Sequence, residues 1–476
     1  MVFFAMPKPS WTVLLLVLTL ASCAEDPPAR ASRNVLLVTV DTLRADALGF
    51  GGAPPAASPR LDRLASESLV FTNAFTQATH THAALSSIMT GLVPPRHGVF
   101  AQHGKLASDV QPIATLLHER GYATGSFVAN LCPLQEIEGT VLHDGWDERY
   151  CGMDMEGVRH GAEQYLWDED VVARARDWIS AQTAPWFCWV HLMDPHGEHR
   201  PPPDLWNYAE DPPPTRRAEY VRLGKLERQR RVPPEEELVN LRARYAAEVQ
   251  GIDRLVGSLV DFADALPDAE RPALLVTADH GEEFFETWPK VGHGLSLTEG
   301  VLHVPLLVRA DSVLPGLNDD YVSTLQVAPT ILELVGAEAH AAMDGESLLA
   351  SSASEGFAVS FCGSMASLRT GRTRYYWDAP MLKRSMNIAA MFELSPHLRD
   401  APWLKEARSV ARYDPAAPNI PEWQARVDGP ATAEIHDRLH LYLVGLGRLA
   451  SEHVIEDAEF DEQLRALGYM GNDVGR

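Results

Sequence analysis

The sequence predicts an α/β fold built on a largely parallel sheet. Residues 34–40 (NVLLVTV) form a continuously apolar run rich in β-branched side chains, as in a parallel strand buried on both faces. A second such run, residues 273–277, follows the long amphipathic helical stretch 234–266. Strands that alternate with helices in this way indicate α/β architecture.

Further elements continue this alternation along the chain. We expect helices at 58–66, 111–120 and 168–180, and strands at 122–128 and 186–192. Residues 200–234 are rich in Pro and Arg and show no periodicity, so we interpret them as a surface insertion near the entrance of the site.

The pattern changes near residue 355. Two short strands are predicted at 356–361 and 367–377, and a final helix ends in LRALGY (464–469). We therefore assign residues 34–350 to a larger domain that carries the candidate site, and residues 351–476 to a smaller α+β domain.

The N-terminal residues predict export and a lipid anchor. Residues 11–20 are apolar but fall short of the roughly 20 residues that span a bilayer as a helix. The next residues, LASC (20–23), resemble a bacterial lipobox, in which the chain is cut before a cysteine that then receives a lipid. We expect residues 1–22 to be a lipoprotein signal peptide, Cys23 to anchor the protein in the membrane, and residues 23–33 to form a tether. The protein would then be an exported bacterial lipoprotein of the cell envelope, periplasmic or at the surface; an ordinary signal peptide with an incidental cysteine is the alternative.

The formal net charge of −24 argues against a nucleic-acid partner, because phosphate backbones are bound by clustered Lys and Arg. A small anionic substrate is still compatible with this charge, since a bound metal supplies local positive charge. Of the cysteines that follow Cys23, Cys132 and Cys151 are the expected disulfide pair in an exported protein.

Acidic and imidazole groups recur at or just beyond the carboxyl ends of predicted strands, where open α/β sheets bind ligands. These groups are Asp41, Asp279 with His280, Asp194 with His196, and His293 between two glycines. Carboxylate together with imidazole suits Zn²⁺ or Mn²⁺ or, with added oxygen ligands, Ca²⁺ or Mg²⁺. Taken alone, Asp41 is also typical of a helix N-cap, and Asp-His-Gly of an ordinary turn.

Several ordered segments resemble the sulfatase branch of the alkaline-phosphatase superfamily. They lie within residues 34–340 and read NVLLVTVDTLRAD, SPRLDRLASESLVFTNAFTQA, SIMTGLVPPRHGV, HLMDPH and VTADHGEEF. The resemblance implies an alkaline-phosphatase-like, doubly wound, mostly parallel sheet with a smaller C-terminal α+β domain. It also implies a metal-dependent hydrolase that acts on small sulfate or phosphate esters.

Carried over by motif, Asp41, Asp279 and His280 correspond to metal ligands of that family. His293 takes the position of a Lys or His on the leaving-group side of the ester, and His196 that of a second donor to the anion. The resemblance implies a divalent cofactor, Zn²⁺, Mn²⁺, Ca²⁺ or Mg²⁺, with one ion expected and a second as an alternative.

The nucleophile position departs from the family pattern. Sulfatases carry Cys or Ser at the start of C/S-x-P-x-R and oxidise it to formylglycine. Counting back nine residues from Thr90 reaches Thr81, with Ala83 and Leu85 in place of the proline and arginine. Threonine cannot give the formylglycine aldehyde. Phosphodiesterase-type relatives instead use a threonine hydroxyl beside the metal, so Thr81 is the predicted nucleophile and a further candidate metal ligand.

Other positions carry weaker predictions. Thr42 replaces a second aspartate of many sulfatases, which favours a more His-rich, transition-metal site. A second ion would draw on Asp194, on His196 or His199, and on His293, although His199 is otherwise expected to be a solvated loop residue. The candidate substrate contacts are Arg44, His82 and Asn130; the alternatives are an ion pair of Arg44 with Asp46, an unremarkable loop histidine and a turn-forming asparagine.

Three functions fit these observations. The first is hydrolysis of a sulfate or phosphate ester through Thr81, with the residue type favouring phosphoester chemistry. The second is phospho-group transfer to an alcohol. The third is a surface lipoprotein that keeps the fold as a binding module without turnover, an alternative suggested by the altered motif from Thr81 to Ser87.

Overall fold

The computed structural model describes residues 34–54, 57–100, 104–152, 164–183, 185–207, 216–229, 231–286, 290–294, 296–338 and 340–350, and the strands 357–362, 365–370, 373–378 and 410–411. An eight-stranded sheet has the order β10-β2-β9-β6-β1-β5-β3-β4. Its strands are β1 (Val35–Val40), β2 (Leu69–Phe75), β3 (Ala123–Val128), β4 (Glu148–Cys151), β5 (Trp186–Leu192), β6 (Ala273–Ala278), β9 (Leu306–Arg309) and β10 (Gly316–Ser323).

Strand β1 lies inside this sheet, which explains its uninterrupted apolar sequence. It pairs in parallel with β5 on one side and with β6 on the other, and all six of its residues are buried. The other neighbouring pairs are also parallel except those of β9, which runs antiparallel to β2 and β6. The predicted mostly parallel α/β sheet is confirmed.

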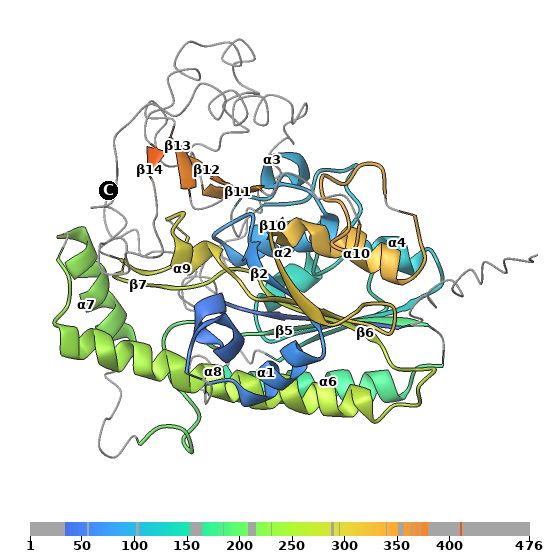
Figure 1. Cartoon of the computed structure of the whole chain (residues 1–476), viewed down its shortest axis with the longest axis horizontal. Helices are drawn as coiled ribbons and strands as arrows, with labels where there is room; N and C mark the ends of the chain where they lie inside the picture. Colours follow the sequence, from blue (N-terminus) through green and yellow to red (C-terminus); the bar gives the residue numbers. More distant parts are fainter. Residues whose placement is uncertain are drawn as a thin grey trace, which may run out of the picture. The chain divides into compact units, whose positions relative to one another are not determined.

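Helices cover both faces of the sheet (Figure 1). On one face lie α1 (Pro59–Ser66), α6 (Gln164–Ser180) and α8 (Glu235–Asp264); on the other lie α2 (Thr81–Thr90), α4 (Ile113–His118) and α10 (Val327–Leu334). The long helix α8 buries an apolar stripe with the three- and four-residue spacing of an amphipathic helix: Leu238, Leu241, Tyr245, Val249, Ile252 and Val256. Three glutamates in its first turn complement the positive end of the helix dipole.

Shorter elements connect these layers. They are α3 (Pro94–His97), α7 (Arg216–Arg228), α9 (Glu299–Leu302), the hairpin of β7 (Glu283–Phe284) and β8 (Val291–Gly292), and the 3-10 turns η1 (Ala45–Ala47), η2 (Gly49–Gly51), η3 (Cys132–Glu136) and η4 (Thr324–Gln326). Within the predicted surface insertion 200–234, residues 216–228 form the helix α7, which the sequence analysis did not predict.

A separate antiparallel sheet contains β11 (Phe357–Cys362), β12 (Met365–Thr370), β13 (Thr373–Asp378) and β14 (Val410–Ala411). The single strand predicted at 367–377 is in fact the two antiparallel strands β12 and β13. The final helix near 464–469, the signal peptide 1–22 and the tether 23–33 lie outside the described residues. Within the described residues, none of the helices has the length and apolar character needed to cross a membrane.

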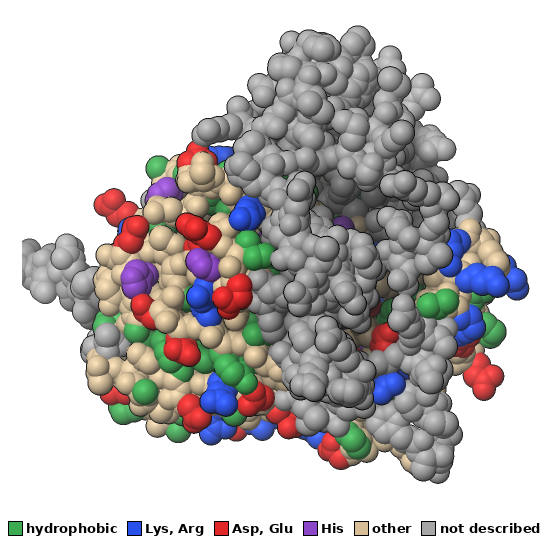
Figure 2. Space-filling model, turned by 180° about the vertical axis from the view of Figure 1, so that it is seen from behind, with side chains coloured by type: hydrophobic (Ala, Val, Ile, Leu, Met, Phe, Trp, Pro, Cys, Tyr) green, Lys and Arg blue, Asp and Glu red, His purple; other side chains and the backbone are tan. Residues whose placement is uncertain are grey.

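Acidic and basic side chains are interspersed over the described part of the face shown in Figure 2. Cys188 is a free, buried thiol in β5, and Cys151 is disulfide-bonded. The side chain of Cys132 lies outside the described part, so its pairing with Cys151 stays a prediction.

Candidate active site at the carboxyl edge of the sheet

The register of three neighbouring strands places the candidate residues side by side. Val40 of β1 pairs with Leu192 of β5 and with Ala278 of β6. The next residue of β1 is Asp41 and the next residue of β6 is Asp279, so the two carboxylates emerge from adjacent strands. A backbone bond of 2.9 Å from the Asp41 amide to the Leu192 carbonyl extends this pairing past the end of β1.

Asp41, Asp279 and His280 form a fully buried group whose potential ligand atoms all lie within 4.8 Å of one another. Asp279 Oδ1 accepts the amides of Thr42 (3.2 Å) and His280 (2.7 Å), whereas its buried Oδ2 accepts no hydrogen bond. Burial raises the pKa of Asp279 to about 6 and lowers the pKa of His280 to about 4. A neutral imidazole beside two desolvated carboxylates is a donor set that suits a divalent cation. The residues present therefore fit the metal that the sequence predicts.

The backbone at Thr42 is held in an unusual conformation. Its φ of 55° lies in the left-handed region, which β-branched residues rarely adopt. Tyr245 of α8 donates its hydroxyl to the Thr42 carbonyl (2.9 Å) and accepts the Arg44 amide (3.0 Å). The buried tyrosine thus fixes the turn whose Thr42 amide binds Asp279.

Thr81 is the first residue of α2 and is fully buried. Its Oγ1 lies 3.3 Å from His280 Nε2. The N-terminus of α2 also provides the positive end of a helix dipole, which favours an anion at this position. The structure thus brings the predicted nucleophile to the predicted metal ligands.

Three imidazoles lie next to one another, and the first of them, His280, contacts Thr81. The ring centroid of His293 lies 4.2 Å from that of His280 and 5.1 Å from that of His196. Burial, followed by the neighbouring His293, lowers the pKa of His196 to about 3, and burial with His280, Lys290 and His80 lowers the pKa of His293. Both rings are neutral at pH 7, so each offers one N–H donor rather than a positive charge.

The loop that carries Asp194 and His196 is anchored by a residue that the sequence did not single out. Buried Asp168 of α6 accepts the amides of Met193 (2.6 Å) and Asp194 (2.9 Å). Among the described residues, Asp194 does not join His196 and His293 in a second group of three converging ligands. The structure therefore supports one metal position in that part of the chain.

His199 is not the solvated residue that the sequence favoured. It is fully buried, with Nδ1 2.7 Å from Glu248 Oε2, and its ring packs on Tyr245 and Phe284. The glutamate on α8 supplies the polar partner that makes this burial favourable. Sequence spacing gave no sign of this pair.

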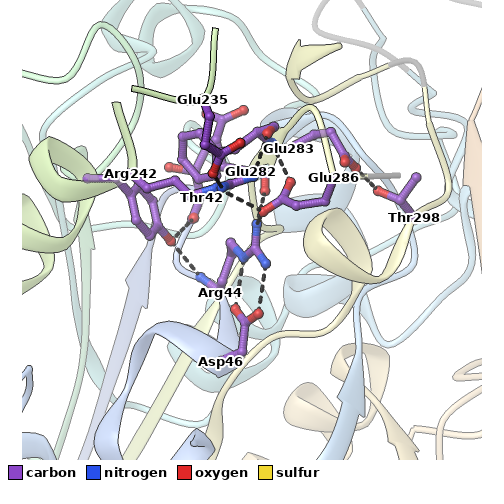
Figure 3. A network of polar contacts seen from close by, with 11 residues as sticks. Thr42, Arg44, Asp46, Glu235, Arg242, Glu282, Glu283, Glu286 and Thr298 are labelled. Atoms are coloured by element: carbon purple, nitrogen blue, oxygen red, sulfur yellow. Dashed lines mark hydrogen bonds and ion pairs between the residues drawn. The ribbon is translucent and has the colours of Figure 1, made fainter. Parts of the chain in front are cut away.

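Arg44 takes part in the alternative interaction, the ion pair with Asp46 (2.7 Å), and in a second ion pair with Glu286 (2.8 Å). It also donates to the Glu282 carbonyl at 3.0 Å. Figure 3 shows these contacts converging on the guanidinium. Four of its five N–H donors are thus used within the fold, and a substrate contact of Arg44 stays a prediction.

Asn130 and His82 are both fully buried. Asn130 follows β3 and donates its Nδ2 to Asp41 Oδ2 at 2.8 Å, so it contacts a predicted metal ligand. His82 lies near His97, whose pKa is lowered to about 3 by burial and by His82. His97 in turn is 2.9 Å from Ser87 Oγ through Nε2.

Sequence reasoning passed over Tyr245, Asp168 and His191. Tyr245 falls on the apolar stripe of α8, and Asp168 stands at the start of the predicted helix 168–180, so their positions alone did not mark them as site residues. His191 carried a readable signal, because it is the one imidazole in the otherwise apolar strand WFCWVHL.

The fold is a mostly parallel α/β sheet with a group of potential metal ligands at its carboxyl edge. The sequence matches the sulfatase family over residues 33–337, and the chain belongs to that family. It is 25% identical over 355 residues to a choline-sulfatase of Rhizobium meliloti (64% of this chain, 67% of the relative) and 24% identical over 363 residues to human arylsulfatase A (68% and 67%). The crystal structure of a phosphonate monoester hydrolase of Agrobacterium radiobacter shares the fold, with a TM-score of 0.61 at 18% identity over 73% of this chain and 87% of that one. By family, the chain is an ester hydrolase.

We predict that a divalent cation stabilises the wild-type protein and not an Asp279→Asn variant. Binding to the folded state alone adds about 2.7 kcal/mol when the cation is at a hundred times its Kd. Thermal unfolding with a chelator and then with Zn²⁺, Mn²⁺ or Ca²⁺ measures this increment. Without metal, Asp279→Asn should match or exceed the wild type, because it removes a buried carboxylate.

Glu283→Gln is the matched control, since this buried neighbour in the same loop bonds to the Thr298 hydroxyl. It should keep the metal-dependent increment. If added cation stabilises Asp279→Asn as much as the wild type, Asp279 is not a ligand of the cation.

We also predict that Tyr245→Phe costs about 1–3 kcal/mol of unfolding free energy, since it leaves the Thr42 carbonyl and the Arg44 amide without their buried partner. Denaturant titration measures the change. Tyr220→Phe is the control, because the Tyr220 hydroxyl is buried and makes no hydrogen bond; its removal should be neutral or stabilising. Equal costs for the two variants would refute the role of Tyr245.

Proposed function

We propose that the protein hydrolyses a sulfate or phosphate monoester or diester at this edge of the sheet, with Thr81 as nucleophile and a divalent cation bound by Asp41, Asp279 and His280. The observation that carries the proposal is the 3.3 Å approach of the Thr81 hydroxyl to His280 within the buried ligand group. The structure joins a hydroxyl, an anion-favouring helix N-terminus and a cation-binding donor set in one place.

When bound, the cation would lower the pKa of the Thr81 hydroxyl and offset the charge of the transferred group. Thr81 Oγ1 attacks the phosphorus or sulfur atom, and its proton passes to solvent water as the new bond forms. The bond to the leaving oxygen breaks with its electron pair on that oxygen, which takes a proton from the His293 N–H, and His293 regains a proton from water. Water then attacks the covalent threonine ester, restores the hydroxyl and releases phosphate or sulfate.

The ring of His293 packs on His280, and the ring of His196 packs on His293; both imidazoles are neutral N–H donors. His293 is the donor proposed for the leaving oxygen, and His196 the donor proposed for a non-bridging oxygen of the anion. His82 stays a candidate contact. Both roles follow from the row of rings beside His280, since donors placed where charge develops stabilise the transition state.

The residue types favour a phosphoester over a sulfate ester and a transition metal over Ca²⁺. Threonine cannot be oxidised to formylglycine, so the hydrated aldehyde of sulfatases cannot be the nucleophile here. The proposed nucleophile is therefore the Thr81 hydroxyl itself. An imidazole among the ligands and Thr42 in place of an aspartate favour Zn²⁺ or Mn²⁺. A solved relative of the same fold is a phosphonate monoester hydrolase, which makes that ester class a sensible probe.

We predict that Thr81→Ala lowers kcat by on the order of 10³-fold or more, because only binding and electrostatic stabilisation would be left. Thr81→Ser should keep part of the activity. The measurement is steady-state hydrolysis of p-nitrophenyl phosphate, p-nitrophenyl sulfate and p-nitrophenyl phenylphosphonate by a purified chain without residues 1–23.

Thr90→Ala is the control, because Thr90 is buried at the other end of α2 and bonds to Ser86. It should leave kcat near that of the wild type. Hydrolysis of a sulfate ester that is indifferent to Thr81→Ala would contradict this nucleophile. A metal-loaded protein that cleaves none of the three esters would favour a binding module.

We further propose that the protein is exported and held at the membrane by a lipid on Cys23, on the sequence pattern LASC at 20–23. Growth with a radiolabelled fatty acid should label the wild-type protein, and Cys23→Ala should abolish the label. A mature wild-type protein without label would contradict the anchor.

A further inference from the structure

Four side chains form a polar row on one face of the sheet, beneath the candidate metal position. Thr39 of β1 pairs with His191 of β5, so their side chains are cross-strand neighbours. Trp189 precedes His191 by two residues and Asp41 follows Thr39 by two, which places all four on the same face. All four are fully buried.

The hydrogen bonds along this row have a definite direction. The Trp189 Nε1–H lies 2.9 Å from Thr39 Oγ1, and an indole can only donate, so the Thr39 oxygen accepts. Thr39 Oγ1 is also 2.8 Å from His191 Nδ1. The Thr39 hydroxyl proton has no other acceptor among the described residues, so it is donated to His191 Nδ1. The proton of the neutral imidazole therefore resides on Nε2.

His191 Nε2 points at Asp41. It is buried, makes no hydrogen bond, and lies 3.9 Å from Asp41 Oδ2. The same oxygen accepts Asn130 Nδ2 at 2.8 Å. Two N–H donors from β5 and from the end of β3 thus face one oxygen of this carboxylate.

We propose that His191 and Asn130 are positioning residues that hold Asp41 by Oδ2 and so present its other oxygen to the cation. This rests on the proposed metal site. Asp279 is arranged in the same way, with Oδ1 taken by two amides and Oδ2 left over. In each carboxylate, protein groups then hold one oxygen and the other oxygen faces the cation. This limits rotation of the carboxylate and lowers the conformational entropy that is lost when the cation binds.

The alternative is that His191 is itself a ligand. The direction of the hydrogen bonds from Trp189 to Thr39 and from Thr39 to His191 argues against this alternative. They place the imidazole proton on Nε2, which then has no lone pair for a metal. His191 also lies outside the group of side chains whose ligand atoms converge within 4.8 Å.

The first test is the tautomer of His191 in the metal-free wild-type protein. ¹⁵N-histidine labelling and long-range ¹H–¹⁵N correlation distinguish the two ring nitrogens, and a His191→Phe variant assigns the signals by their loss. We expect a protonated Nε2 and an unprotonated Nδ1, unchanged on addition of ¹¹³Cd²⁺. A proton on Nδ1, or a ¹¹³Cd coupling to His191 Nε2, would overturn the proposal.

The second test removes the hydrogen bond from Thr39 to His191, neither of which is a proposed ligand of the cation. Thr39→Val keeps the shape of the side chain and removes the hydroxyl, and Thr39→Ser restores it. We expect Thr39→Val to weaken Zn²⁺ affinity by about 10-fold or more, as loss of an outer partner of a ligand does, and Thr39→Ser to recover it. Competition with a chromophoric chelator measures the affinity. Asn130→Leu should weaken it as well.

His303→Gln is the control, because His303 bonds to the Thr72 carbonyl and belongs to neither the row nor the ligand group. It should bind Zn²⁺ like the wild type. Thr39→Val with wild-type affinity, or Thr39→Ser as weak as Thr39→Val, would overturn the proposal. A wild-type protein that binds no cation would overturn the metal site itself, whereas the tautomer is read without metal, so the two failures are distinguishable.

Discussion

The rest of this site depends on two buried carboxylates that lie beside each other and need a positive counter-charge. Asp41 and Asp279 are fully buried, and with His280 their ligand atoms lie within 4.8 Å. Removing one such charge from water costs several kcal/mol, and two together also repel each other. A divalent cation is the counter-charge that this arrangement fits, and parallel pairing of β5, β1 and β6 is what brings the carboxylates together.

The side chains around Asp41 and Asp279 hold the neighbouring backbone turns in place. Thr42 takes a left-handed φ with Tyr245 of α8 holding its carbonyl, and the Asp168 carboxylate of α6 secures the next loop along the edge. Burial lowers the pKa values of the nearby imidazoles and so keeps them neutral, as the proposed roles of ligand and donor require. Helices on one face of the sheet thus hold backbone turns in place, while α2 on the other face delivers Thr81.

Local pattern was enough to predict the strands β1, β5 and β6 and the helices α1 and α8, because each carries an uninterrupted apolar run or a clear amphipathic period. It was also enough to bring Asp41, Asp279 and His280 together, since parallel strands end at one edge, whereas Thr81 was assigned to the site through the resemblance to the sulfatase motif. Long-range partners were out of reach. Buried His199 has its polar partner in Glu248 on α8, and Arg44 forms an ion pair with Glu286, which is distant in sequence. The spacing of residues along the sequence predicts neither contact. The helix α7 was missed because its Arg-rich sequence has little amphipathic period.

The central claim is that Thr81 carries the transferred group. Acid quenching of the metal-loaded wild-type enzyme during turnover of a p-nitrophenyl ester, followed by proteolysis and mass spectrometry, tests it most directly. The account predicts one phosphoryl or sulfo group on the Thr81 side chain, and none on that peptide in Thr81→Ala. Steady turnover with an unmodified Thr81 peptide, or with the group on another residue, would contradict it.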